Sequence, residues 1–303
     1  MTGQPDQPDF LAQFSSALVA RAAAAAGAVV AIRLGHERHL TGLVWQPDVV
    51  VASEQSLPNK DAFELVAAGG AVVTATVAGR DASTNIALLR LATPLAPPVF
   101  SPAEAQVGAL ALAIGADGAG GTSARLGLVN LSGPEWQSSR GGRIDRRIVL
   151  DLALAHREEG GPVYDASGGL LGLSTFGPRG QVIVIPTATI ARIVPLLAKD
   201  GHIARGWLGV ALQAVAVPDA LREGAGQSSG LMVMSVVEGG PAAHAGLVAG
   251  DIILSVDGTS TQRWRKVARL FGPDSIGRKA EIRLIRSGQV LTVETTIAER
   301  RAA

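Results

Sequence analysis

The 303-residue chain contains no cysteine, and this absence excludes thiol catalysis, disulfide bonds and cysteine-ligated metal sites. Charge is also scarce, because charged residues make up 17% of the chain and the formal net charge is +1. Such a balance creates no strong field around the protein, so we expect no nucleic-acid partner. The 47% of hydrophobic residues instead indicates a compact globular protein.

The chain also lacks a long, uninterrupted hydrophobic run. Four polar residues break the first apolar stretch, residues 10–32: Gln13, Ser15, Ser16 and Arg21. We therefore expect an amphipathic helix leading into a strand, and no membrane span. The opening residues 1–9 lack the basic region of a secretory signal, which predicts a cytoplasmic protein. An upstream start codon that added a signal peptide would instead place it in the periplasm or outside the cell.

Motifs for metals and cofactors are missing or incomplete. His36 and His39 do not have the spacing of a helical metal motif and have no evident third ligand. The segment 115–122 is similar to a phosphate-binding loop, but Gly121 stands where the lysine belongs. We expect no metal and no cofactor.

What the chain does contain is a succession of short apolar runs. Between residues 28 and 186 these runs recur among glycine and proline residues, which is typical of an all-β barrel or sandwich. A helical pattern follows at 187–198, and 199–206 has the composition of a linker. The length of the chain predicts about two domains.

The region after the linker carries the longest motif. Residues 236–258 read VVEGGPAAHAGLVAGDIILSVDG, in which Pro241 begins a short helix and residues 251–256 form a strand closed by an Asp-Gly turn. A helix is predicted over 261–271, followed by a hairpin of 280–286 with 290–297. The motif resembles the core of a bacterial PDZ domain.

A second motif lies in the β-rich region, where residues 151–162 read DLALAHREEGGP. This segment resembles the nucleophile loop of the HtrA family, trypsin-like serine proteases followed by a PDZ domain. The resemblance implies a mainly β protein, with a trypsin-like double β-barrel followed by one small α+β PDZ domain. It divides the chain into an N-terminal helical segment (1–26), a protease-like domain (27–198), a linker (199–206) and a PDZ domain (207–303).

The same resemblance locates a degenerate catalytic triad. Glu159 takes the position of the serine, Gln55 that of the histidine and Asn85 that of the aspartate, while Arg157 replaces a glycine that donates an oxyanion N–H. Serine proteolysis needs a hydroxyl nucleophile, an imidazole base and a carboxylate that orients it. The substitutions therefore predict a catalytically inactive homologue, a pseudoprotease.

The altered cleft leaves two interpretations open. Glu158 and Glu159 are neighbours on a loop and are expected to point apart, so they form a poor acid and base pair. Glu159 either hydrogen-bonds Gln55 or Asn85 in an inert cleft, or it recognises a basic ligand or acts as a base.

In PDZ domains of this kind, a turn such as 207–210 offers backbone N–H groups to the carboxylate of a peptide, and the next strand pairs with the peptide. The predicted peptide-binding residues are Trp207, Leu208, Gly209, Val210, Val267 and Leu270. These residues predict ligands with an apolar C-terminal residue. A basic face of Arg263, Arg265, Lys266 and Arg269 is either solvated or favours acidic residues of the peptide.

The leading hypothesis is an inactive HtrA-like protein that binds peptides or protein C-termini as an adaptor, chaperone-like holder or regulator of an active protease partner in protein quality control. One alternative is an active serine-type endopeptidase or other hydrolase that uses non-standard residues. Another is a purely structural oligomer. The resemblance also implies a homotrimer held by N-terminal aromatic residues, for which Phe10 and Phe14 are the candidates.

Overall fold

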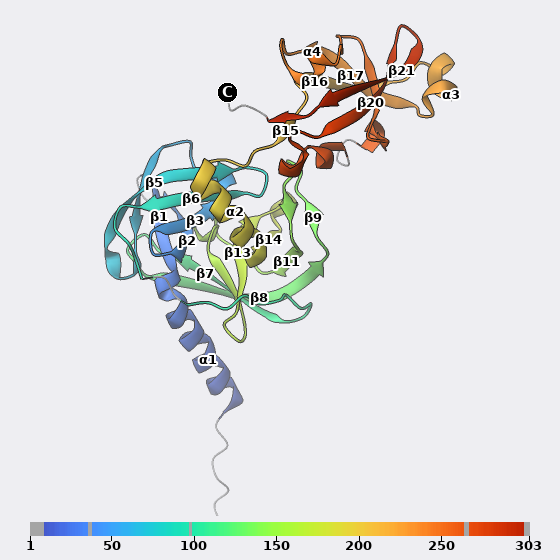
Figure 1. The fold of residues 1–303 in the computed structure, drawn as a ribbon. Coiled ribbons are helices and arrows are strands. Elements are labelled where there is room, and N and C mark those ends of the chain that lie inside the picture. Colours follow the sequence, from blue (N-terminus) through green and yellow to red (C-terminus); the bar gives the residue numbers. More distant parts are fainter. Residues whose placement is uncertain (1–8, 36–37, 97–98, 264–266, 300–303) are drawn as a thin grey trace, which may run out of the picture. The chain divides into compact units, whose positions relative to one another are not determined.

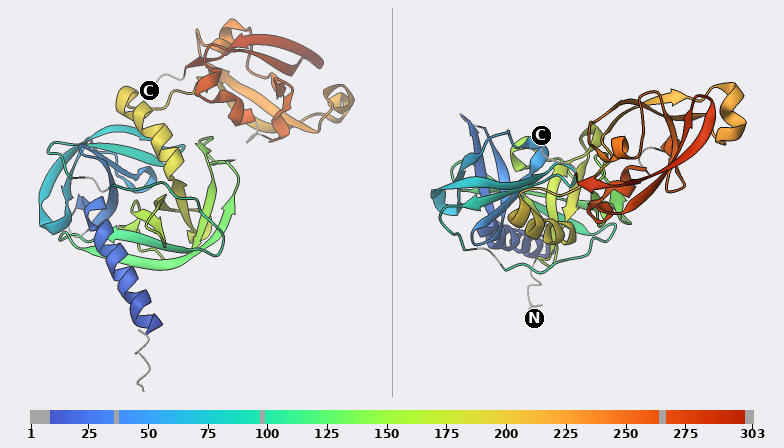
Figure 2. Two further views of the ribbon diagram at one scale, coloured as in Figure 1. Left: turned by 60° about the horizontal axis from the view of Figure 1, so that its bottom comes forward. Right: turned by 45° about the horizontal axis from the view of Figure 1, so that its top comes forward.

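The computed structural model describes residues 9–35, 38–96, 99–263 and 267–299 of the chain (Figures 1 and 2). It divides into two compact units, Met1–His202 and Ile203–Ala303. The predicted fold class is confirmed, since the first unit contains two β-barrels and the second is a small α+β domain.

The first barrel is closed by six antiparallel strands in the order β1-β2-β3-β6-β5-β4. Its strands are β1 (Val29–Gly35), β2 (Arg38–Gln46), β3 (Val49–Ser53), β4 (Ala62–Val66), β5 (Val72–Asp81) and β6 (Ile86–Leu91). Their inward side chains form one apolar core that includes Ile32, Val50 and Leu89. A short 3-10 turn, η2 (Glu54–Ser56), follows β3 at the rim of this barrel.

The second barrel has the strand order β11-β14-β13-β12-β7-β8. Its strands are β7 (Leu110–Ala116), β8 (Thr122–Gly133), β11 (Arg147–Asp151), β12 (Pro162–Asp165), β13 (Leu170–Phe176) and β14 (Val182–Pro186), with the short pair β9 (Trp136–Gln137) and β10 (Arg143–Ile144) beside it. Between β11 and β12 lies the 3-10 turn η4 (His156–Glu158). The helix α2 (Thr187–Asp200) ends the unit, and Gly201 closes it in the left-handed conformation that glycine adopts readily.

The N-terminal helix α1 (Phe10–Ala25) is mostly exposed, and Figure 1 shows it extending beyond the strands of its unit. Together with the turn that follows, it forms one helical stretch, Phe10–Ala28, that is long and apolar enough to cross a membrane by length and composition. The polar residues of this stretch therefore do not make it too polar by this composition test, contrary to expectation. Its serine and glutamine residues are uncharged, and Arg21 is its one charged residue.

The second unit is built on a sheet in the order β16-β17-β18-β20-β21. These strands are β16 (Val210–Ala216), β17 (Ser229–Val236), β18 (Ile252–Val256), β20 (Lys279–Arg286) and β21 (Gln289–Thr296), and β19 (Thr259–Ser260) pairs with β18. The short strands β15 (Gly206–Trp207) and β22 (Ala298–Glu299) pair separately, and two short helices are α3 (Arg222–Ala225) and α4 (Pro241–His244).

Every described residue of the helix predicted over 261–271 is helical, and Val267 has the α-helical conformation. The structure has two 3-10 turns there, η7 (Thr261–Arg263) and η8 (Ala268–Phe271), and residues 264–266 between them lie outside the described residues. Thr261 is buried, and its hydroxyl donates hydrogen bonds to the carbonyl oxygens of Ile253 at 2.8 Å and Leu254 at 2.9 Å. These bonds fix the start of the segment to β18 and favour a tight turn.

Candidate functional site

The loop around Gly160 joins the two barrels. The N–H of Thr41 on β2 donates to the carbonyl oxygen of Glu159 at 3.1 Å, and the N–H of Gly160 donates to that of Ser174 on β13 at 2.9 Å. Gly160 has a φ of +89°, and a Cβ there would lie 2.2 Å from the carbonyl oxygen of Thr41. Only glycine fits this position, so the loop is held in a single place between the barrels.

The three predicted triad positions come together beside this loop. The side-chain amide of Gln55, in η2, donates to Oε1 of Glu159 at 2.7 Å. Asn85 contacts Gln55 through the backbone, since its Oδ1 accepts the N–H of Gln55 at 2.7 Å. Asn85 has a φ of +60°, a left-handed conformation that asparagine tolerates better than most residues.

Glu159 is 1% exposed, and its two carboxylate oxygens have different surroundings. Oε1 accepts hydrogen bonds from the Ser53 hydroxyl at 2.8 Å, the Gln55 amide at 2.7 Å and the Thr175 hydroxyl at 2.8 Å, and a longer one from the N–H of Phe176 at 3.4 Å. Oε2 accepts the hydroxyl of Ser56 at 2.5 Å. A buried carboxylate is costly unless it is hydrogen-bonded, and these donors meet that requirement.

Asn85 completes the network without touching Glu159. Its Nδ2 donates to the hydroxyl oxygens of Ser53 at 3.0 Å and Thr175 at 2.7 Å. Those two hydroxyl groups are thereby left to donate their protons to Glu159. Of the two hydrogen-bond partners predicted for Glu159, the structure shows Gln55 and not Asn85.

The sequence interpretation missed Ser53, Ser56 and Thr175. Ser53 and Ser56 flank Gln55 in the chain, and their spacing around the position of the family histidine was the available signal. Thr175 lies on β13, more than a hundred residues away, and only the pairing of the two barrels brings it to the site.

Glu158 is equally buried but belongs to a separate cluster. Nε of Arg125 contacts both of its carboxylate oxygens at 3.0 Å, and Ser123 and the N–H of Ala155 each donate to it at 2.8 Å. Burial by itself raises the pKa of Glu158, but the Ala155 N–H, the Ser123 hydroxyl and Arg125 together lower that pKa below its ordinary value. The two neighbouring glutamates therefore point apart, and Glu158 is an ion-paired anion.

Arg157, predicted as the altered oxyanion position, lies in the middle of η4. Its carbonyl oxygen accepts the hydroxyl of Thr41 at 2.8 Å. Within the same turn, the N–H of Glu158 donates to Ala155 at 2.9 Å and the N–H of Glu159 donates to His156 at 3.3 Å. The bond from Glu159 is the longer of the two.

The predicted peptide-binding residues lie at one edge of the second unit. Leu208 and Val267 are buried in its core, and Val210 and Leu270 pack against that core while partly exposed. β16, which begins at Val210, is an edge strand of the main sheet and pairs with β17 on one side among the described strands.

Trp207 and Gly209 shape the turn before this edge strand. Trp207 pairs with Ala298 in the short β15–β22 ladder. Gly209 has a φ of +80°, and a Cβ there would lie 3.2 Å from the indole ring of Trp207. In the predicted basic face, Arg265 and Lys266 lie outside the described residues.

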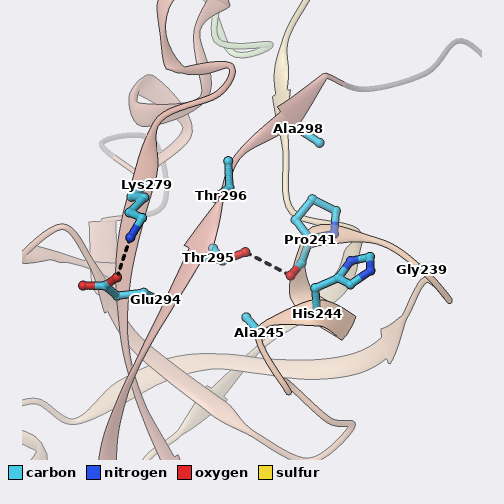
Figure 3. Close-up of a pocket in the computed structure, with 9 residues that line it drawn as sticks. All are labelled: Gly239, Pro241, His244, Ala245, Lys279, Glu294, Thr295, Thr296 and Ala298. Carbon is cyan, nitrogen blue, oxygen red and sulfur yellow. Dashed lines mark hydrogen bonds and ion pairs between the residues drawn. The ribbon is translucent and has the colours of Figure 1, made fainter.

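The second unit also has a pocket of about 530 Å³ that is separate from the predicted peptide-binding residues. Figure 3 shows it between α4 and β21, with Lys279 and Glu294 paired at 3.5 Å on one wall and the hydroxyl of Thr295 donating to the carbonyl oxygen of Pro241 at 3.0 Å. It is lined by Gly239, Pro241, His244, Ala245, Lys279, Glu294, Thr295, Thr296 and Ala298. None of these is a predicted peptide-binding residue.

Among the described residues, no group of three or more potential ligands could hold a metal ion. His36, one of the histidines considered in the sequence, lies outside the described residues.

Comparison with known proteins identifies both domains. A trypsin-like peptidase domain matches residues 40–173, and a PDZ domain matches residues 206–297. The probable periplasmic serine endoprotease DegP-like of Brucella suis biovar 1 (strain 1330) is 32% identical over 281 residues, which cover 88% of this chain and 54% of that protein. The protein of the same name from Rhizobium meliloti (strain 1021) is 30% identical over 258 residues, covering 82% of this chain and 50% of its own. The chain thus spans about half the length of these curated relatives.

Solved structures show the same fold. The HtrA-type protease AlgW with decapeptide superimposes with a TM-score of 0.70 at 22% identity, covering 95% of this chain and 99% of that chain. The serine endoprotease from Yersinia pestis superimposes with a TM-score of 0.69 at 24% identity, covering 94% of this chain and 98% of that chain.

The names of these relatives contradict two predictions. The curated relatives are named serine endoproteases, which contradicts the prediction of a catalytically inactive homologue that is not an enzyme. They are also named periplasmic, which contradicts the prediction of a cytoplasmic protein. The apolar stretch Phe10–Ala28 near the N-terminus is compatible with a signal sequence.

Proposed function

We propose that this chain, in which a trypsin-like peptidase domain precedes a PDZ domain, is a member of the HtrA family and a serine-type endopeptidase with non-standard catalytic residues. In this proposal Ser56 is the nucleophile and Glu159 is its general base. The observation that carries the proposal is the 2.5 Å hydrogen bond from the Ser56 hydroxyl to Oε2 of Glu159.

The surroundings of Glu159 support the role of a base. Four donors hold Oε1, so the carboxylate is fixed in orientation and Oε2 is directed at Ser56. In the serine protease triad a third group orients the base in the same manner. Ser56 is partly exposed, whereas Ser53 is fully buried, so Ser56 is the hydroxyl that a substrate reaches.

The chemistry balances with water as the second reactant. Oγ of Ser56 attacks the peptide carbonyl carbon while its proton passes to Oε2 of Glu159. Glu159 then returns that proton to the leaving amine, and an acyl ester on Ser56 remains. Water attacks the ester and gives its proton to Glu159, and the proton returns to Ser56 as the acid product leaves.

The same proton transfer removes an electrostatic obstacle. An ionised Glu159 would repel a developing oxyanion, but Glu159 is neutral once it holds the proton of Ser56.

The test compares hydrolysis of labelled casein by the full chain and by two variants, Ser56→Ala and Glu159→Gln. Loss of a general base lowers the rate by about a hundredfold or more. Ser167→Ala is the matched control, because Ser167 also donates to a carboxylate, Asp165 at 2.7 Å, but at an exposed turn. A fluorophosphonate probe is expected to label Ser56, as located by mass spectrometry. Absence of hydrolysis by the full chain, or equal hydrolysis by Ser56→Ala, would overturn the proposal.

The PDZ domain is proposed to bind peptides or protein C-termini with an apolar last residue. The edge of β16 that pairs with no other described strand offers backbone groups for an added strand, and the partly exposed Val210 and Leu270 offer apolar contacts. We further place the protein in the periplasm. A homotrimer and an active protease partner stay predictions, although Phe10 and Phe14 stack with ring centroids 6.2 Å apart and Phe10 is 74% exposed.

A further inference from the structure

A second pocket, of about 750 Å³, lies at one end of the first barrel, away from Ser56 and Glu159. The end of β1, the start of β2 and the start of β4 meet there, together with the loop that contains Gly118. Its lining residues are Arg33, Leu34, Gly35, Arg38, His39, Lys60, Ala62, Phe63, Glu64 and Gly118.

The charge of this pocket is strongly one-sided. Arg33, Arg38 and Lys60 line the pocket together with one carboxylate, that of Glu64, so the lining residues carry a net charge of +2 with His39 neutral. The carboxylate of Asp117, which interacts electrostatically with His39, is not a lining residue. Arg33 pairs with Glu64 at 3.3 Å. Within residues 9–35, 38–96, 99–263 and 267–299, Arg38 and Lys60 have no recorded ion pair. The chain as a whole has a net charge of only +1, so this excess is local.

The floor and back wall of the pocket are rigid. Phe63 is 4% exposed and belongs to the core of the first barrel, and Leu34 packs against the same core. Nε2 of His39 lies 3.0 Å from the carbonyl oxygen of Ala116; because a carbonyl only accepts, Nε2 carries the proton. The other ring nitrogen, Nδ1, then faces Gly118, where a Cβ would lie 3.4 Å away.

The glycine-rich loop 115–122 forms this wall without binding an anion through its own backbone. The carboxylate of Asp117 accepts the N–H groups of Gly121 at 2.7 Å and Ala119 at 2.8 Å. These backbone hydrogen bonds, with that of Gly121 the largest contribution, hold the pKa of Asp117 below its ordinary value. The loop is therefore fixed by an internal anion, and the cations available to a ligand are the side chains opposite it.

From this geometry we infer that the pocket binds a phosphate-type dianion through Arg38, Lys60 and Arg33. A guanidinium matches two oxygens of a phosphate, and an ammonium adds a compact point charge. Two sources share this chemistry, a free condensed phosphate and the phosphate headgroup of a lipid. The inference is independent of the proposed hydrolysis, since no lining residue belongs to the Ser56–Glu159 network.

The test uses the full chain and two ligands, inorganic pyrophosphate in calorimetric titration and phosphatidylcholine vesicles with or without phosphatidic acid in cosedimentation. Binding to pyrophosphate identifies a free phosphate as the ligand, and binding only to the phosphatidic acid vesicles identifies a headgroup. Arg38→Gln and Lys60→Gln are each expected to weaken the binding observed by about tenfold, the lower part of the range for a lost charge-assisted hydrogen bond.

Arg90→Gln is the matched control, because Arg90 is a half-exposed arginine of the same barrel that pairs with Asp48 and does not line the pocket. Retained affinity in this control supports a specific site. Failure of both ligands to bind overturns the inference, as does equal weakening in all three variants. Binding to vesicles that lack phosphatidic acid would indicate that the apolar helix α1 binds the membrane. That result would also count against the inference. Phosphate binding is measured without a protease substrate. A failure to bind phosphate is therefore distinguishable from a failure of the proposed hydrolysis.

Discussion

Glu158 and Glu159 show how two neighbouring buried carboxylates acquire different roles from their partners. Glu158 is paired with the guanidinium of Arg125, whereas Glu159 is held only by neutral donors. A carboxylate that is ion-paired is stabilised as an anion and is a weaker base than one held by neutral groups. Of the two, Glu158 has a charged partner in Arg125, whereas the described donors to Glu159 are hydroxyl, amide and backbone N–H groups.

We expect Arg125→Met to lower the free energy of unfolding by about 1–2 kcal/mol at pH 7, because it leaves the buried Glu158 anion with fewer charge-assisted bonds. This loss is at the low end of the range for charge-assisted hydrogen bonds, because the side chain of Arg125 is 41% exposed and solvent screens its charge. The folded-state pKa of Glu158 is lowered, so the pair stabilises the protein above the ordinary carboxyl pKa and this contribution is lost as pH falls through the folded-state value. Urea denaturation at several pH values should show the difference from wild type shrinking below about pH 4. Arg90→Met, which removes an exposed pair, is the control, and a pH-independent difference would contradict the role of Glu158.

The main residues of the Glu159 cluster were predictable only in part. The motif 151–162 identified Glu159, and the segments around Gln55 and Asn85 identified their shared location, because those residues lie in runs that resemble family motifs. The hydroxyls of Ser53, Ser56 and Thr175 were not predicted, since serine and threonine are common in loops and their role depends on hydrogen-bond geometry. The chemistry of a site depends on this geometry as much as on residue type.

The edge strand β16 and the turn before it form the element on which peptide binding is proposed. Gly209 has a positive φ, and its carbonyl oxygen accepts the N–H of Val237 at 2.8 Å, which fixes the start of β16 against β17. A side chain at this position would strain the backbone and press on Trp207. The geometry of the turn is therefore set by glycine.

We expect Gly209→Ala to weaken binding of a labelled peptide that ends in valine by about tenfold, which corresponds to about 1.4 kcal/mol. Fluorescence anisotropy with the full chain measures this effect, and an amidated peptide shows whether the terminal carboxylate is needed. Gly226→Ala is the control, since Gly226 has a φ of +70° but a Cβ there meets no atom within 4 Å. Equal binding of the amidated peptide, or equal weakening by both variants, would contradict the proposed groove.

Elements with local turn signals were the most predictable. Pro241 and the turn at Asp257-Gly258 bound α4 and β18, because proline favours a first helical turn and an Asp-Gly pair favours a tight turn. In the helix predicted over 261–271 every described residue is helical, and the periodicity of the segment was enough to predict it. The hydrogen bonds of the buried Thr261 hydroxyl to β18 were not predicted, because they are tertiary contacts.

For the molecule as a whole, the two domain motifs were enough to predict the fold, since each spans several elements with fixed spacing. The predicted cytoplasmic location was wrong, because it depended on the lack of a basic region in residues 1–9 and on the polar residues of the stretch that follows. Serine and glutamine cost far less in a bilayer than charged residues do, and Arg21 is the only charged residue of Phe10–Ala28.

We expect this helix to direct export of the full chain. Alkaline phosphatase fused to the C-terminus should be active, because the enzyme gains its disulfide bonds only in an oxidising compartment. The double variant Leu11→Arg and Val19→Arg puts two charges into α1, each costing about 2.5–3.5 kcal/mol in a membrane-spanning helix, and should abolish most reporter activity. Both side chains are exposed, 69% and 66%, so the folded barrels are expected to tolerate the change. The control Val72→Arg places a charge at a 54% exposed position on β5 and should leave reporter activity intact. Unchanged activity in the double variant would show that α1 does not carry the export signal.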